Sequence, residues 1–389
     1  MRHRILTLND ISARGLERLP RERYEIAAGL ERPDAILVRS ADMHGMAIPD
    51  SLRAVGRAGA GVNNIPVAEL SRRGIPVFNA PGANANAVKE LVLAGLLIAA
   101  RNICAAWAFA RSLSGDDHAI DAAVEKGKKK FVGFELPGRT LGVVGLGAIG
   151  VEVANSALAL GMKVLGYDPQ ITVQRAWQLS SNVEQALSLD DLFARADAIT
   201  VHVPLNDHTR KLVNEARLKL MKKGGSILNF ARAGIVDDQA VVGALESGRL
   251  HSYVCDFPSN ALKDHPKVVT LPHLGASTGE AEENCAVMVA DQLRDFLENG
   301  NLKNSVNYPE AVLPRAPNTA RLAVANSNVP NMVGQISTCL ASARINIADL
   351  LNKSRGEYAY TLIDADGTIG DDLLQKVRAI DGVLSARII

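Results

Sequence analysis

The chain has 389 residues, 47% of them apolar, which is enough to build packed cores in two or three domains. This excludes a disordered tail or a small disulfide-stabilised module. The 43 basic and 42 acidic residues leave a formal charge of +1, so the excess of positive charge that would favour a nucleic-acid partner is absent.

The cysteines and the apolar runs indicate the cellular compartment of the protein. The four cysteines form no Cys-x-x-Cys pair, so neither a disulfide framework nor a metal site is expected. Arg2 and Arg4 precede only four apolar residues, which is too short for an export signal. The longest apolar run, Leu91–Ala100, has ten residues, about half of a membrane crossing. We expect a cytoplasmic protein with no membrane partner.

Short apolar, β-branched runs indicate two lobes. The first hundred residues hold five of them, separated by polar or helical stretches: ILTL, YEIA, AILVR, RAVGRAGA and IPVFNA. Between Arg139 and His273 six more alternate with helical segments: TLGVVG, KVLGYD, DAITVHVP, SILNFA, SYVCDF and VVTLPH. This alternation predicts an α/β fold with two doubly wound parallel sheets, one in a smaller flavodoxin-like lobe and one in a larger Rossmann-type lobe.

Two long amphipathic helices predict how the lobes connect. One covers about Val88–Arg111, and the other, about Gly279–Asn299, returns the chain to the first lobe. The smaller lobe is therefore expected to be discontinuous, formed by residues 1–90 and 281–307, with the larger lobe at 91–280. A ligand cleft is expected between them.

The end of the chain predicts a third unit. Prolines and asparagines indicate a linker at 308–318. Residues 319–389 then alternate strand and helix in the order βαββαβ, which is typical of a ferredoxin-like domain.

A glycine motif follows the first strand of the larger lobe. Gly145, Gly147 and Gly150 form Gly-x-Gly-x-x-Gly at the start of a predicted helix. The first glycine permits a tight turn, the second lets a pyrophosphate approach the backbone, and the third packs helix on strand. The N–H groups of that helix start, including those of Ala148 and Ile149, would bind the phosphates.

Asp168 predicts which dinucleotide binds. It stands 18 residues after Gly150, at the end of the run KVLGYD, where a carboxylate can bond both ribose hydroxyls. It would repel a 2′-phosphate, and Pro169 and Gln170 follow it where an arginine would be needed. The predicted cofactor is NAD rather than NADP.

Three polar residues follow later strands of the same lobe. They are Arg232 after SILNFA, Asp256 after SYVC and His273 after VVTLP. A 2-hydroxy acid needs a planar fork of donors for its carboxylate and C2 oxygen and one group to carry the hydroxyl proton. Arg232 suits the first task and His273 the second. Asp256 would either orient the nicotinamide carboxamide or cap a loop.

The segments VVGLGAIG, VHVPLNDHT, NFARAGIVDD and PHLGAS resemble the motifs of the D-2-hydroxyacid dehydrogenases. The resemblance extends over nearly the whole chain, through GRAGAGVNNI, FNAPGANANAVKELV and SVNYPE. It implies reversible, NAD-dependent oxidation of 3-phosphoglycerate at C2, the first step of serine biosynthesis. It also implies a homodimer formed around Ala99–Arg111, or a homotetramer if the tails pair as well.

The resemblance assigns roles to individual residues. Arg232 would hold the substrate and His273 would be the general acid and base. Further cofactor contacts would come from His202, Pro204, Thr209, Ala231, Asp256 and Gly275. The smaller lobe would bind the carboxylate through the amides of Ala60, Gly61 and Val62 with Asn84 nearby, and the substrate phosphate through Arg39 and Ser40.

The chain departs from the family pattern near the proposed base. The glutamate that usually hydrogen-bonds the histidine is missing from DFPSNALKDHPKVV, where Asn260 and Ala261 stand instead. Without that charge the imidazolium is less stabilised, so we expect the pH profile of reduction to be shifted toward acid, unless Asp264 or Asp256 substitutes. Ala233 also replaces a usual glycine and would be strained if its φ were positive.

The tail resembles an ACT regulatory domain. Asn326, Asn328 and Asn346 stand where such tails bind serine at an interface between copies. Asn326 takes the place of a frequent histidine, and Asn331 that of the glycine in a usual Pro-Gly turn, which leaves the effector open. A purely structural tail that aids oligomerisation is the alternative.

Two other functions are compatible with these motifs. One is a hydroxypyruvate or glyoxylate reductase of the same family, and the other is an NAD-sensing binding protein of the corepressor type. The preference for phosphorylated over unphosphorylated substrate distinguishes the first. The amino-acid-binding type of tail argues against the second.

Overall fold

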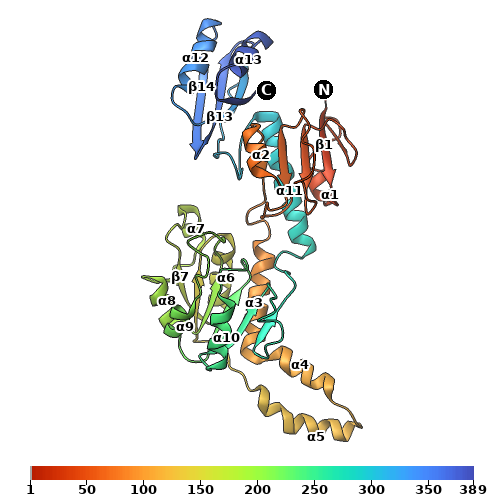
Figure 1. Cartoon of the computed structure of the whole chain (residues 1–389), viewed down its shortest axis with the longest axis vertical. Coiled ribbons are helices and arrows are strands. Elements are labelled where there is room, and N and C mark those ends of the chain that lie inside the picture. The colour runs from red at the N-terminus through yellow and green to blue at the C-terminus, as the bar shows by residue number, and fades with distance from the viewer. Residues whose placement is uncertain (1) are drawn as a thin grey trace. The chain divides into compact units, whose positions relative to one another are not determined.

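The computed structural model describes residues 2–389, which form two compact units (Figure 1). The first unit combines the residues up to Asn84 with Gly279–Ile389, and the second is Ala85–Thr278. These divisions lie a few residues before the predicted boundaries at 90 and 280. The residues after 319, predicted as a separate domain, belong to the first unit.

The first unit contains a five-stranded parallel sheet in the order β2-β1-β3-β4-β5. Its elements are β1 (His3–Leu8), α1 (Ala13–Leu16), β2 (Tyr24–Ala27), β3 (Ala35–Val38), β4 (Ala54–Arg57), α2 (Val67–Arg72), β5 (Val77–Phe78) and the long α11 (Gly279–Asn299). A Cβ at Gly56 of β4 would lie 2.7 Å from Val289 of α11, so the helix packs on the sheet over a glycine. This is the predicted smaller lobe.

The second unit contains a seven-stranded parallel sheet in the order β12-β11-β10-β9-β6-β7-β8. Its elements are β6 (Thr140–Val144), α6 (Ala148–Ala159), β7 (Lys163–Tyr167), α7 (Val173–Gln178), β8 (Glu184–Gln185), α8 (Leu189–Arg195), β9 (Ala198–Val201), α9 (Glu215–Leu220), β10 (Gly225–Asn229), α10 (Asp238–Glu246), β11 (Leu250–Cys255) and β12 (Val268–Thr270). All six predicted strands are present, and β8 is an additional two-residue edge strand. Strands β9 and β10 are buried throughout, as expected of a parallel sheet covered on both faces.

The predicted helix Val88–Arg111 is wrong in one respect: it is two helices. Asn102 adopts a left-handed conformation with φ of 51° and separates α3 (Ala85–Arg101) from α4 (Ile103–Ser112). The two axes differ by 63°. Asparagine tolerates the left-handed conformation better than most residues, so the chain can turn at Asn102. The apolar periodicity continues on both sides of this turn, which is why the sequence predicted a single helix. Helix α5 (Asp117–Gly127) and the 3₁₀ turn at Lys128–Phe131 follow, and the arm formed by α4 and α5 extends from the unit (Figure 1).

No single helix within residues 2–389 is long and apolar enough to span a membrane. The bent pair α3 and α4 meets that criterion of length and composition only when the two are taken together. In α3, Val92, Leu96 and Ala100 are buried in the core of the second unit.

The C-terminal part of the first unit has the predicted βαββαβ order. It consists of β13 (Thr319–Ser327), α12 (Met332–Ser342), β14 (Ile347–Arg355), β15 (Tyr358–Asp366), α13 (Asp371–Arg378) and β16 (Val383–Ile388). The four strands pair antiparallel in the order β14-β15-β13-β16. Two parallel-sheet lobes and a small antiparallel C-terminal sheet confirm the predicted fold class.

The predicted linker 308–318 is packed rather than free. Tyr308, Ala311 and Leu313 are buried in one core with α11 and the C-terminal sheet. The Tyr308 ring lies 5.4 Å from that of Tyr358, and its hydroxyl donates to the Ser71 carbonyl at 2.7 Å. Proline and asparagine content indicated irregular backbone correctly, but did not reveal that aromatic side chains hold it in place.

A buried ion pair joins the C-terminal sheet to this segment. Arg321 of β13 and Asp364 of β15 are both 0% exposed and form two hydrogen bonds of 2.6 and 2.7 Å. The guanidinium also donates to three carbonyls, those of Asn299, Leu313 and Pro314, at 2.8–3.1 Å. Every N–H of the fork is thereby directed at an acceptor, which is the condition for tolerating a charge in a core.

Candidate active site

The glycine motif lies between β6 and α6, and each glycine is needed for its own reason. Gly145 has φ of 90°, and a Cβ there would lie 2.7 Å from the His202 carbonyl oxygen. A Cβ at Gly150 would lie 1.9 Å from the Gly145 carbonyl oxygen. A Cβ at Gly147 would meet nothing within 4 Å, so the space beside this residue is open. The outer glycines serve the protein's own packing, and the middle one leaves room for a ligand.

The start of α6 supplies donors to that space. Gly147 is the N-cap residue and no side chain caps the helix. The N–H groups of the first turn, including those of Ala148 and Ile149, have no acceptor within the helix. Together with the positive end of the helix dipole they form an anion site suited to a pyrophosphate.

Asp168 follows β7 and is fixed beside the glycine loop. One carboxylate oxygen accepts from the Leu146 amide at 2.8 Å, and the other accepts from the Gln170 amide at 2.9 Å. No side-chain cation within the second unit pairs with it. Its negative charge therefore stays available for the hydroxyls of a ribose and against a 2′-phosphate.

We predict that Asp168→Asn shifts cofactor preference. The amide keeps the shape and one acceptor but removes the charge that bonds the ribose and repels a phosphate. The ratio of kcat/KM for NAD over NADP should fall roughly tenfold or more. Steady-state kinetics with both cofactors measure the ratio. Asp190→Asn, an exposed aspartate of α8, is the matched control and should leave it unchanged; an unaltered ratio in Asp168→Asn would contradict the assignment.

The remaining predicted residues of this unit line the same edge of the sheet. Neighbouring parallel strands are about 4.8 Å apart, so six consecutive strands present their carboxyl ends over about 24 Å. In spatial order the residues that follow β7, β6, β9, β10, β11 and β12 are Asp168, Gly145, His202, Arg232, Asp256 and His273. This row suits an extended dinucleotide with its ribose end at β7 and its reactive end at β10 to β12.

His202 is held as a neutral ring. Burial lowers the pKa of His202 to about 3, and its Nε2 lies 2.9 Å from the Thr200 hydroxyl. Its Nδ1 is buried without a hydrogen-bond partner in the described part of the chain. A neutral imidazole here adds no positive charge near the middle of the row.

Arg232 is presented by a turn that Asn229 organises. The buried Asn229 side chain accepts from the Ala231 amide at 3.2 Å and donates to the Arg232 carbonyl at 3.0 Å. The Arg232 guanidinium is exposed and bonds only the Ala231 carbonyl, at 2.6 Å. Ala233 is not in the left-handed region, and the positive φ of 81° falls on Gly234, so the expected strain at Ala233 is absent.

His273 has a left-handed backbone that Asp256 supports. Its φ is 58°, and its amide donates to the Asp256 carbonyl at 3.2 Å. The buried Asp256 carboxylate accepts from the amides of Leu274 and Gly275 at 2.8 and 2.7 Å. Of the two roles considered for Asp256, capping the loop is the one these contacts favour. The His273 ring itself is exposed and packs edge-on against Phe257 at 5.2 Å.

The second unit offers the His273 ring no carboxylate partner. Both oxygens of Asp256 are occupied by amides, and Asp264 is exposed with Lys263 3.9 Å away. Neither residue therefore takes the place of the missing glutamate within this unit. The expected acid shift of the reduction profile stays a prediction, and a profile that is flat between about pH 6 and pH 9 would contradict it.

The other predicted cofactor residues lie in loops around the same edge. Pro204 and Thr209 belong to one turn, in which the threonine hydroxyl donates to the Pro204 carbonyl at 2.5 Å. Ala231 and Gly275 are the residues held by Asn229 and Asp256. These four assignments rest on the family resemblance and stay predictions.

In the first unit, Arg39 and Ser40 follow β3 at the carboxyl edge of its sheet. The Arg39 guanidinium is ion-paired with Glu282 of α11, and its contact with a substrate phosphate stays a prediction. A substrate phosphate would compete with this carboxylate for the guanidinium. The Ser40 amide bonds the Asn9 side chain at 3.2 Å.

Arg57 is a candidate that sequence reasoning missed. It ends β4 as Arg39 follows β3, and its Nε donates to the Arg39 carbonyl at 3.0 Å. A Cβ at Gly59 would lie 1.7 Å from its guanidinium, so the side chain lies directly over this loop. The sequence did carry one indication of this role: Arg57 stands near the end of a predicted strand, next to the segment GAGV that was predicted to bind the substrate carboxylate.

The residues predicted to bind the substrate carboxylate follow β4. Ala60, Gly61 and Val62 lie in the loop after β4, and the Ala60 carbonyl accepts from the Asn79 side chain at 2.6 Å. Asn84 is the last residue of this part of the first unit. This loop, Arg39 with Ser40, and Arg57 all follow or end strands at the carboxyl end of the sheet. The substrate role of these residues and of Asn84 stays a prediction.

The three predicted effector residues are not brought together in one chain. Asn326 is fully buried, with its side chain donating to the Ser327 carbonyl. Asn328 and Asn346 bond Gly356 and Asp366 and lie at opposite ends of the sheet. Ser327 and Ile347 pair with positions of β15 seven residues apart, which is about 23 Å.

Comparisons with known proteins agree with this geometry. Residues 96–275 match the model of the D-isomer specific 2-hydroxyacid dehydrogenase NAD binding domain. The chain is 33% identical to the D-3-phosphoglycerate dehydrogenase of Haemophilus influenzae, over 87% of this chain and 81% of that one. It spans only 48% and 58% of two other relatives so named, those of Methanocaldococcus jannaschii and Rattus norvegicus.

Two solved structures are similar as well. The apo D-mandelate dehydrogenase of Rhodotorula graminis is 26% identical with a TM-score of 0.68, over 81% of this chain and 100% of that one. The NAD⁺-bound 3-phosphoglycerate dehydrogenase of Entamoeba histolytica is 25% identical with a TM-score of 0.61, over 79% and 99%.

A parallel sheet with a Gly-x-Gly-x-x-Gly loop after β6, an aspartate after β7, and an arginine and a histidine at the same edge is typical of NAD-dependent oxidoreductases, and the comparisons assign this chain to that class. The chain belongs to the D-2-hydroxyacid dehydrogenase family.

Proposed function

We propose that this enzyme reversibly oxidises 3-phosphoglycerate to 3-phosphohydroxypyruvate with NAD, the first step of L-serine biosynthesis. The observation that carries the proposal is the placement of Arg232 and His273 after β10 and β12, two strands apart at the edge that carries the dinucleotide loop. The relatives named D-3-phosphoglycerate dehydrogenase support the choice of substrate. They do not favour the reductase or the corepressor alternative.

The chemistry follows from the residues. The Arg232 fork would bind the substrate carboxylate and C2 oxygen and hold C2 in one orientation. His273 would take the C2 hydroxyl proton during oxidation and return it during reduction. Bound NAD supplies the hydride acceptor. In the other lobe, Arg39 and Arg57 would bind the phosphate, and the amides of Ala60, Gly61 and Val62 would bind the carboxylate.

Steady-state kinetics with NADH test the proposal. Reduction of 3-phosphohydroxypyruvate should exceed that of hydroxypyruvate in kcat/KM, and Arg39→Ala should lower this ratio because the phosphate loses a cation. Equal kcat/KM for both substrates in the unaltered enzyme would instead support the hydroxypyruvate or glyoxylate reductase.

The arm formed by α4 and α5 supports a homodimer. No residue of α4 is buried, and Trp107 is 62% exposed next to the half-exposed Ile103. The arm is internally ordered, because Phe109 packs against Phe131 at 5.3 Å. An ordered element with exposed large apolar side chains is suited to a partner surface.

We predict that Trp107→Lys converts the dimer to monomers at micromolar concentration, as measured by sedimentation velocity. The charge would have to be buried without a partner in the interface. Trp177→Lys is the matched control, since this tryptophan is 85% exposed on α7, outside the arm. A dimer that survives Trp107→Lys would contradict the proposal.

The C-terminal sheet supports a serine-binding regulatory domain of ACT type. Because Asn328 and Asn346 lie at opposite ends of the sheet, they would meet at one ligand only across two tails. Tail pairing of this kind would also extend a dimer to a tetramer.

The free thiols at all four cysteines support a reducing, cytoplasmic location.

We predict that millimolar serine weakens catalysis by a coupling free energy of about 1–3 kcal/mol, and that Asn346→Ala abolishes this inhibition with little change in basal kcat. Initial rates with and without serine provide the measurement. Unchanged rates at millimolar serine would contradict the effector assignment without touching the assigned reaction.

A further inference from the structure

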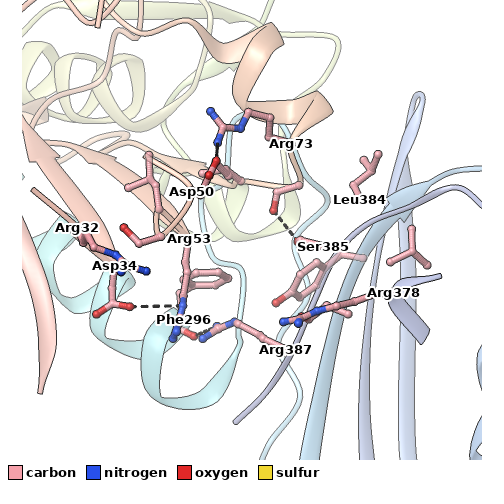
Figure 2. Close-up of a pocket in the computed structure, with 17 residues that line it drawn as sticks. Arg32, Asp34, Asp50, Arg53, Arg73, Phe296, Arg378, Leu384, Ser385 and Arg387 are labelled. Atoms are coloured by element: carbon pink, nitrogen blue, oxygen red, sulfur yellow. Dashed lines mark hydrogen bonds and ion pairs between the residues drawn. The ribbon is translucent and has the colours of Figure 1, made fainter. Parts of the chain in front are cut away.

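A cleft of about 550 Å³ lies within the first unit, away from the edge that carries the predicted substrate residues (Figure 2). One wall is formed by the residues that lead into β3, β4 and β5, and the opposite wall by β16 with Tyr360 of β15 and Arg378 of α13; Phe296 of α11 completes the lining. The volume is within the range of about 300–1,000 Å³ that small-molecule sites have. The cleft therefore has room for a metabolite.

The lining is strongly basic. Five arginines and two aspartates line the cleft, which leaves three positive charges unmatched: Arg32, Arg53, Arg73, Arg378 and Arg387, with Asp34 and Asp50. Since the whole chain carries a formal charge of only +1, this excess is local. Both walls contribute arginines, as Figure 2 shows for Arg53 on one side and Arg387 on the other.

The aspartates are already committed to two of the arginines. Asp34 pairs with Arg53 at 3.4 Å and Asp50 with Arg73 at 3.1 Å. Arg378 bonds only the Ala386 carbonyl, at 2.8 and 3.0 Å. It therefore has no anionic partner among the described residues.

Arg387 and Arg32 also lack an anionic partner in the described chain. Arg387 donates to the carbonyls of Phe296 and Leu297 and lies over the Phe296 ring at 4.1 Å. Burial lowers the pKa of the Arg387 guanidinium and the positive charge of Arg53 lowers it further, whereas Tyr360 and Asp34 act in the opposite direction. An anion in the cleft would offset the repulsion between Arg387 and Arg53.

The position in the fold separates this cleft from the substrate residues. Asp34 and Arg53 stand at the amino ends of β3 and β4, whereas Arg39 and Arg57 stand at or beyond their carboxyl ends. Each strand has four residues, so the two ends lie about 13 Å apart. A ligand bound in the cleft would leave the other end of the sheet free.

We propose that this cleft binds a small phosphorylated anion, which bridges the smaller lobe and the C-terminal sheet. A tetrahedral phosphoryl dianion presents three oxygens to guanidinium groups that come from opposite walls, and it compensates more charge than one planar carboxylate does. Because both walls hold the same ligand, its binding stabilises the docking of the C-terminal sheet.

Titration of the full chain with inorganic phosphate tests the proposal, by calorimetry and by the melting temperature, at constant ionic strength adjusted with chloride. Phosphate should bind saturably and raise the melting temperature. The double variant Arg53→Gln/Arg378→Gln, which alters exposed side chains from opposite walls, should bind phosphate roughly tenfold or more weakly.

Two controls separate this site from other basic surfaces. Arg195→Gln alters an exposed, ion-paired arginine of the second unit, and Arg39→Gln alters the proposed substrate ligand; both should keep the affinity for phosphate at the cleft. Absence of saturable binding, or loss of it in Arg39→Gln but not in the double variant, would overturn the proposal. Saturable binding of malonate without that of phosphate would overturn the phosphoryl assignment.

Discussion

Replacing His273 by glutamine should lower kcat for both directions of the reaction by roughly 10²- to 10⁴-fold, the range that a positioned general acid and base contributes. Glutamine keeps a polar side chain of similar length but cannot exchange a proton near neutral pH. The ring is exposed, so its loss should leave the fold intact. Rates with NADH and 3-phosphohydroxypyruvate, compared with NADH binding followed by fluorescence, separate chemistry from cofactor affinity.

The neighbouring Asp256→Asn provides a comparison for His273→Gln. This change weakens the two amide contacts that hold the left-handed backbone at His273, so kcat should fall by less and the loop should become more mobile. A His273→Gln enzyme that retains kcat within a factor of about ten would show that another group carries the proton.

Removing one member of the buried Arg321–Asp364 pair should lower the free energy of unfolding by about 3–5 kcal/mol. In Arg321→Met the carboxylate stays in the core without its partner, and three backbone carbonyls lose a donor. Urea unfolding measures the loss. Arg4→Met, which removes an exposed pair with Glu25, should cost no more than about 1 kcal/mol.

The pair should also make stability depend on pH. Burial opposes ionisation of Asp364, but hydrogen bonds from Arg321 and the Ala316 amide outweigh it, so the pKa of Asp364 is lowered. A carboxyl with a lowered folded-state pKa contributes stability above its unfolded value of about 3.9 and loses it as pH falls through the folded value. The double variant Arg321→Met/Asp364→Leu should remove this dependence below about pH 4 and restore much of the stability; failure to do so would contradict the assigned role.

The architecture was largely predictable because each element carried its own signal. Strands of the second unit are buried on both faces, so their sequences are continuous apolar runs between polar turns. The two-residue β8 is too short to produce such a run. The break at Asn102 was missed because the apolar periodicity of α3 continues into α4, which is exposed.

The candidate site could be predicted from the sequence where a backbone conformation requires particular residue types at a fixed spacing. The three glycines and Asp168 combine a fixed spacing with a strand, a turn and a helix. Pairings between distant segments leave no such pattern: the ion pair of Arg39 with Glu282, which are 243 residues apart, required coordinates. The same holds for the cleft, whose five arginines come from five separate segments of the chain.

The packing of Tyr308 and Tyr360 with α11 also constrains how this enzyme can evolve. A tail attached by a free tether can be exchanged for an unrelated module by recombination, because nothing else depends on it. Here the strands of the tail complete the interior of the lobe that precedes them, with the Tyr360 hydroxyl donating to the Gly300 carbonyl at 2.8 Å. Loss or replacement of the tail would expose the apolar side chains of the smaller lobe that the tail now covers. We therefore expect the smaller lobe and the C-terminal sheet to be inherited together.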